Sequence, residues 1–120
     1  MEKSEFVESI KSRTKKLALD VIFVFDSSKK TDSSIVIGKQ LIRSITSVAA
    51  NYRAACISRS QKEFFAKISI LVEEADEALF WLEMLRDANF ISKEKVQPLM
   101  DETLEILKIV SKARKNVNFN

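Results

Sequence analysis

Between residues 64 and 85, apolar side chains recur at alternating steps of four and three residues: Phe64, Ile68, Leu71, Ala75, Ala78, Leu82 and Leu85. This spacing places them on one stripe of an α-helix and is typical of the seam of a left-handed helical bundle. The whole chain holds one glycine and one proline in 120 residues, too few for strands joined by tight turns. We therefore predict an all-α fold.

Helical spacing of apolar residues recurs in the rest of the chain. We expect four helices, over about residues 3–27, 34–55, 60–88 and 92–115. The links between them are short, so consecutive helices should be antiparallel neighbours. A chain of 120 residues is also long enough to bury its own core. We predict a single domain over residues 1–120, an antiparallel up-down-up-down left-handed four-helix bundle.

Polar residues and one glycine refine the second and third helices. Asp32 or Ser33 is expected to cap the second helix, and Ser60 with Glu63 forms a capping box at the start of the third. Gly38 falls inside the second helix, where glycine costs about 1 kcal/mol relative to alanine unless another part of the chain packs close to it. We interpret Gly38 as a position of close approach.

The fourth helix has two possible starts. Ser92 is a suitable cap, but Pro98 would then lie beyond the first turn, so a start near Gln97 stays open. The basic tail, residues 112–120, is expected to fray.

The chain contains no histidine, and this absence restricts its chemistry. Ser-His and Cys-His nucleophilic pairs are impossible, and so is the Glu-x-x-His ligation of di-iron bundles. Glu73 and Glu77 lie one turn apart and keep open a carboxylate-only metal site, but a solvated acidic face is the favoured interpretation. We expect a protein that is not an enzyme, with no catalytic residues, no metal site and no cofactor.

Cysteine usage and hydropathy indicate a cytoplasmic protein. Cys56 is the only cysteine, so no intramolecular disulfide can form, and a reducing compartment is expected. The longest apolar run, residues 21–25, is far shorter than the roughly 20 residues that span a bilayer, so no membrane partner is expected. Cys56 is interpreted as a packing residue; a reactive thiol activated by Arg53 and Arg59 is the alternative.

Charge is distributed unevenly along the middle of the chain. Residues 33–62 hold five basic residues and no acidic one, whereas residues 63–90 hold seven acidic residues against two basic ones. The basic segment predicts contacts with nucleic acid through Lys39, Arg43, Arg53 and Arg59. Pairing of these residues with carboxylates such as Glu74, or hydrogen bonding between subunits, remains the alternative.

A second apolar row runs beside the first on the third helix. It contains Phe65, Val72 and Leu79, with Phe80 and Trp81 near its end. One stripe should suffice for a single domain, so the second row predicts burial against another copy of the chain. The predicted oligomer interface comprises Asn51, Tyr52, Phe65, Val72, Leu79, Phe80 and Trp81.

Four segments within residues 40–85 carry a family resemblance: QLIRS at 40–44, SVAANYR at 47–53, RSQKEF at 59–64 and EADEALFWLEML at 74–85. As a spaced set they resemble the bacterial four helix bundle protein family, also called the 23S rRNA intervening-sequence protein family. The chain departs from the commoner family pattern at three positions. Ala49 replaces a usual Gly, Ala54 a usual Glu, and Glu73 a usual Lys, which makes the third helix more acidic.

The resemblance implies a left-handed four-helix bundle that forms ring-shaped homopentamers. It also extends to the accessory bundle proteins of diversity-generating retroelements, which work with a reverse transcriptase and nucleic acid. Sequence and resemblance together predict a non-enzymatic homo-oligomeric module that contacts nucleic acid or a nucleic-acid enzyme through a basic surface. A purely structural protein-protein scaffold is the alternative, and a carboxylate-metal enzyme is the less favoured one.

Overall fold

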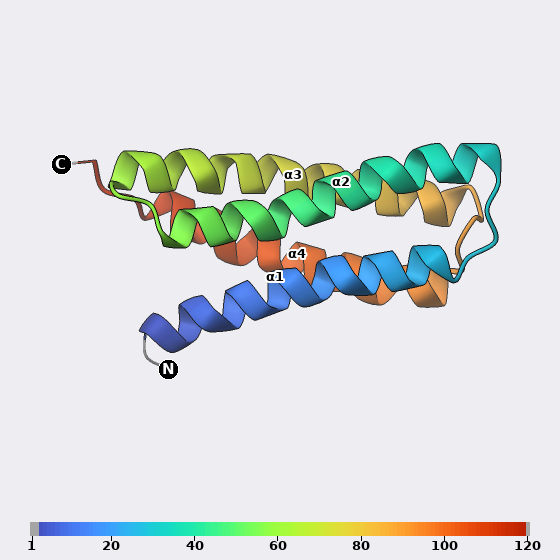
Figure 1. Ribbon diagram of the computed structural model, residues 1–120, viewed down its shortest axis with the longest axis horizontal. Helices are drawn as coiled ribbons and strands as arrows, with labels where there is room; N and C mark the ends of the chain where they lie inside the picture. Colours follow the sequence, from blue (N-terminus) through green and yellow to red (C-terminus); the bar gives the residue numbers. More distant parts are fainter. Residues whose placement is uncertain (1–2, 120) are drawn as a thin grey trace.

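The computed structural model describes residues 3–119, which form four α-helices joined by short links (Figure 1). They are α1 (Lys3–Asp26), α2 (Asp32–Cys56), α3 (Gln61–Asp87) and α4 (Lys93–Lys115), and no strand occurs between residues 3 and 119. Consecutive helices run in opposite directions and pack together, and α1 also packs against α4. The all-α four-helix bundle is confirmed, with every helix boundary within two residues of its prediction.

The apolar stripe predicted on α3 lies in the core. Ile68, Leu71, Ala75, Ala78, Leu82 and Leu85 are all buried, and Phe64 packs against the core from its edge. The other helices supply large, fully buried partners such as Ile10, Leu17, Leu41, Ile45 and Ile106. Full burial of one such side chain contributes about 1.5–3 kcal/mol, so this shared interior accounts for the bundle.

The second apolar row of α3 is used within one chain. Leu79 is buried, Val72 packs against the core, and Phe65 contacts Phe119 beyond the end of α4. The reason is topological, since α3 packs against both α2 and α4 and therefore buries two stripes. The second row does not by itself require another copy of the chain.

Helix caps agree only in part with the sequence. The second helix is capped by Thr31 instead of Asp32 or Ser33: Ser34 N donates to Thr31 Oγ1 at 3.1 Å, and Thr31 N donates to Ser34 Oγ at 2.8 Å. Ser34 is buried there and completes a capping box that the Glu-centred pattern did not suggest. The prediction failed because Ser34, at the third helical position, accepts the hydrogen bond from the cap residue that a glutamate usually accepts.

The structure also shows which residues cap α3 and α4. Ser60 Oγ accepts from Glu63 N at 3.0 Å, as predicted, but the Glu63 carboxylate lies near Arg59 instead of returning to the Ser60 backbone. Helix α4 begins at Lys93 with Ser92 as its cap residue, and it continues through Pro98. The earlier of the two proposed starts is therefore observed, although the Ser92 hydroxyl makes no capping hydrogen bond.

Candidate nucleic-acid interface

Arg43, the central residue of the predicted basic surface, is neutralised within the chain. Its Nη1 donates to Glu74 Oε2 at 2.9 Å and its Nη2 to Glu77 Oε1 at 2.5 Å. Trp81 Nε1 donates to the same Glu77 oxygen at 3.2 Å. Antiparallel packing of the basic α2 against the acidic α3 brings these groups together. Arg43 therefore pairs with carboxylates of the same chain, which was the alternative to contact with nucleic acid.

The other three predicted cations are spread along α2 and the link after it. Lys39 and Arg53 are exposed on α2, and 14 residues separate them, about 21 Å along a helix. Arg59 lies in the link after α2 and is almost fully exposed, with its Nε 3.8 Å from Glu63 Oε2. The four residues therefore do not form one continuous patch.

A denser basic cluster lies where α2 ends, α3 begins and α4 ends, at one extremity of the bundle (Figure 1). We call it the basic end; its members are Arg59, Lys62, Lys112, Arg114 and Lys115. In the described part of the chain only Arg59 of this set makes an ion pair. The first turns of α1 contribute acidic residues to the same extremity, of which Glu8 pairs with Lys11 at 3.3 Å.

Aromatic rings lie beside the cations of the basic end. Phe65 and Phe119 meet edge to face with ring centroids 5.2 Å apart, and the Arg114 guanidinium carbon is 5.7 Å from the Phe65 centroid. They border a surface hollow of about 430 Å³ that Ser111, Lys115 and Val117 complete. The Phe119 ring is 61% exposed. Exposed aromatic rings next to Arg and Lys are the combination that binds single-stranded nucleic acids by stacking and phosphate contacts.

Sequence reasoning missed this cluster because its residues come from two segments, 59–65 and 112–119, that are distant in the sequence. Lys62 and Phe65 begin α3, whereas Arg114 and Lys115 end α4 and Phe119 follows it. The basic tail was the available signal, but it was expected to fray. The structure ends α4 at Lys115, as predicted, but packs Phe119 on Phe65 beyond it; Asn120 lies outside the described residues.

The predicted oligomer-interface residues divide into two groups. Tyr52 and Leu79 are buried in the core, and Phe65 and Val72 are half-buried within the chain. Asn51 Nδ2 donates to Ser47 O and Ser47 Oγ, both at 2.9 Å, so its amide is satisfied within α2.

Phe80 and Trp81 form the second group. Their rings meet edge to face at 4.9 Å, with Phe80 exposed and Trp81 half-buried above Glu77. These two residues keep apolar surface available for another molecule.

Comparison with known proteins fits this architecture. The profile of the 23S rRNA-intervening sequence protein family matches residues 9–112, most of the chain. The chain belongs to this family. It is similar to a crystal structure of a protein of unknown function from the S23 ribosomal protein family of Bacteroides thetaiotaomicron, with a TM-score of 0.80 and 28% identity. The alignment covers 89% of this chain and 99% of the other. No curated protein matches the chain.

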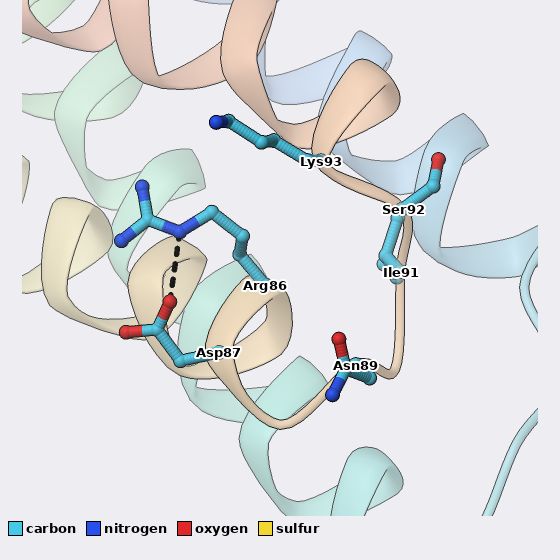
Figure 2. Close-up of a pocket in the computed structure, with 6 residues that line it drawn as sticks. All are labelled: Arg86, Asp87, Asn89, Ile91, Ser92 and Lys93. Carbon is cyan, nitrogen blue, oxygen red and sulfur yellow. Dashed lines mark hydrogen bonds and ion pairs between the residues drawn. The ribbon is translucent and has the colours of Figure 1, made fainter.

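Two other hollows of this intervening-sequence family member were considered as candidate sites. One, of about 660 Å³, lies at the α3–α4 turn, where Figure 2 shows Arg86 bonded to Asp87 across from Ser92 and Lys93. The Arg86 Nε to Asp87 Oδ1 distance is 2.9 Å, so the arginine is already paired.

The other hollow is a cleft of about 790 Å³ at the basic end, between the first turns of α1 and the ends of α2 and α4. Tyr52 and Cys56 line it, and their side chains share a hydrogen bond. Burial raises the pKa of both groups, so at neutral pH the phenol and the thiol stay protonated. Cys56 also packs against the core, in keeping with its interpretation as a packing residue.

Acidic residues do not gather into a metal-ligand set. Between residues 3 and 119, no three Asp, Glu or Cys side chains are placed to hold one metal ion together. Glu77, half of the considered carboxylate pair with Glu73, is instead engaged by Arg43. Among the helices described, none is both long and apolar enough to cross a membrane.

Proposed function

We propose that this protein is a non-enzymatic module that assembles with copies of itself and binds single-stranded nucleic acid at its basic end. The observation that carries the proposal is the juxtaposition of Phe65 and Phe119 with Arg114 and Lys115 around one hollow. Arginine and lysine attract phosphates, and an exposed ring offers a stacking platform to a base. The family name refers to 23S rRNA, so RNA is the first ligand to test.

The distribution of ion pairs favours the basic end, rather than the surface of α2, as the binding site. Arg43 already faces two carboxylates, and a phosphate there would have to compete with Glu74 and Glu77. Lys62, Lys112, Arg114 and Lys115 face no such competition from ion pairs in the described residues. Binding at the basic end should therefore tolerate Arg43→Gln.

The test measures fluorescence anisotropy of a labelled single-stranded RNA of about 20 nucleotides at several salt concentrations. We expect the R114E/K115E variant to bind at least tenfold more weakly. Its slope of log affinity against log salt should fall by about 1.4, about 0.7 for each lost phosphate contact. The matched control is K29E/K30E, which makes the same charge change in the α1–α2 link at the other extremity. Equal weakening in both variants, or no binding by the unaltered protein at low salt, would contradict the proposal.

A purely structural scaffold is the second candidate. It is favoured by exposed apolar side chains on α1 and α3, including Phe23 and Phe80, which lie outside the hollow proposed to bind nucleic acid. A protein that self-associates but binds neither RNA nor DNA at low salt would support this candidate.

A further inference from the structure

The solvent-exposed faces of α1 and α3 lie on opposite sides of the bundle. Helices α1 and α3 each pack against α2 and α4 but not against each other, so they occupy diagonal corners of the bundle. They run in the same direction (Figure 1). Both leave large apolar side chains in solvent: Leu19 and Phe23 of α1 are 43% and 66% exposed, and Phe80 and Met84 of α3 are 49% and 37% exposed.

The α1 face is basic at one end and apolar at the other. Lys11, Lys15, Leu19 and Phe23 follow one another at steps of four residues, which places them in one row along the helix. Beside this row a groove of about 460 Å³ runs between α1 and α2, and its lining on α2 includes Ala49, Ala50 and Arg53. Neither Lys15 nor Arg53 makes an ion pair with any described residue.

The α3 face carries the opposite charge in the same order. Glu73 and Asp76 come first along the helix, followed by Phe80 and Met84. Both carboxylates are exposed and neither forms an ion pair within residues 3–119. The face is therefore acidic where the α1 face is basic, and apolar where that face is apolar.

The two rows match in register. When α3 is laid parallel to α1, Asp76 falls opposite Lys15, Phe80 opposite Leu19, and Met84 opposite Phe23. Each of these rows covers eight residue steps, about 12 Å of helix. An antiparallel alignment would instead place the carboxylates against Leu19 and Phe23 and leave the lysines facing apolar side chains.

We propose that the α3 face of one copy docks along the α1/α2 groove of a second copy, with α3 parallel to α1. The inference rests on the self-association in the proposed function and names the two surfaces that meet. Since α1 and α3 are already parallel within one chain, the contact can repeat by rotation about an axis along the bundle. Each copy then uses both faces, as a head-to-tail interface in a closed ring requires.

Complementary charge reversals test the pairing. The K15E/R53E variant alters the groove and the E73K/D76K variant alters the α3 face. We expect each variant alone to be a monomer at concentrations where the unaltered protein is an oligomer, measured by light scattering after size-exclusion chromatography. An equimolar mixture should associate again into alternating assemblies with an even number of copies, because each groove can then meet the oppositely charged α3 face of the other variant.

A control variant and a folding check complete the experiment. The D101K/E105K variant reverses two exposed carboxylates of α4, outside the proposed contact, and should remain an oligomer. Circular dichroism should show unchanged helix content in all three variants, since every altered side chain is exposed.

The outcomes separate this inference from the proposed function. If the unaltered protein is a monomer, self-association itself fails. If the unaltered protein and both variants are oligomers, self-association stands and the named surfaces are wrong. Monomeric variants whose mixture stays monomeric would overturn the pairing of the α1/α2 groove with the α3 face.

Discussion

The ring of Phe25, near the end of α1, lies directly against the α-carbon of Gly38 in α2. A β-carbon at position 38 would overlap three atoms of this ring, Cε1, Cε2 and Cζ. Phe25 is only 7% exposed, so the ring cannot move aside without leaving the core. The only glycine of the chain thus lies inside a helix because an aromatic side chain occupies the space of its missing methyl group.

The Gly38→Ala variant should be less stable than the unaltered protein. Alanine gains up to about 1 kcal/mol in helix propensity, but overpacking of a core typically costs about 1–3 kcal/mol. We expect urea denaturation to show a net loss in the free energy of unfolding. The double variant with Phe25→Leu should recover part of it, and strictly additive losses would contradict the contact.

The contact between Arg43 and Glu77 should be visible in a titration. The Arg43 guanidinium, helped by a hydrogen bond from Trp81, holds the pKa of Glu77 below its ordinary value. The pair therefore stabilises the fold above about pH 4.3, the ordinary glutamate pKa. This contribution is lost as the pH falls through the lower, folded-state pKa.

We expect a carbon-13 titration of the Glu77 side chain to show this lowered pKa in the unaltered protein and a return toward the ordinary value in Arg43→Gln. Glu73→Gln is the control, because Glu73 makes no ion pair in the described residues. If the pKa of Glu77 were the same in Arg43→Gln as in the unaltered protein, Arg43 would not be the cause of its lowering.

Arg13 and Glu102 form the ion pair that joins α1 to α4. Two hydrogen bonds link them, Nε to Oε2 at 3.0 Å and Nη2 to Oε1 at 2.7 Å, with each side chain about one third exposed. Arg13→Gln should lower the free energy of unfolding by roughly 0.5–1 kcal/mol, less at high salt. The double variant with Glu102→Gln should lose little more free energy of unfolding than Arg13→Gln alone. Lys16→Gln, which breaks an exposed pair within α1, should cost less.

Cys56 should react slowly with thiol reagents. Burial raises its pKa, whereas the positive charge of Lys11 and the hydrogen bond from Tyr52 work in the opposite direction. The alkylation rate of the folded protein should therefore reach its midpoint at higher pH than that of a free thiol, and unfolding in urea should accelerate it. Tyr52→Phe should raise the midpoint further. A rate that matches glutathione at every pH would show that the thiol is not shielded.

The helices could be predicted because their signals are local. The four-three spacing of α3 and the Ser60 cap depend on residues within a few turns of one another. The number of stripes that α3 buries could not be predicted in this way, because it depends on how extensively the helix packs against each of its neighbours. Thr31 was missed for a different reason, since its partner Ser34 is an unusual member of a capping box.

The candidate site was less accessible to sequence reasoning. The opposite charges of α2 and α3 correctly suggested pairing, and Arg43 with Glu74 and Glu77 bears this out. Charge counting along the chain could not place Phe65 beside Arg114, because that proximity depends on the antiparallel path of α3 and α4. Nor could it show that Phe119 contacts Phe65.

The order of the helices around the bundle has a kinetic consequence. Contacts join neighbours along the chain, most extensively α2 with α3, and only the limited α1–α4 packing joins distant segments. Such low contact order is associated with folding in microseconds to milliseconds. We expect the α2–α3 hairpin to form early and α1 to close the bundle last. The groove between α1 and α2 would then exist only in finished chains, so an incompletely folded copy could not enter an assembly through it.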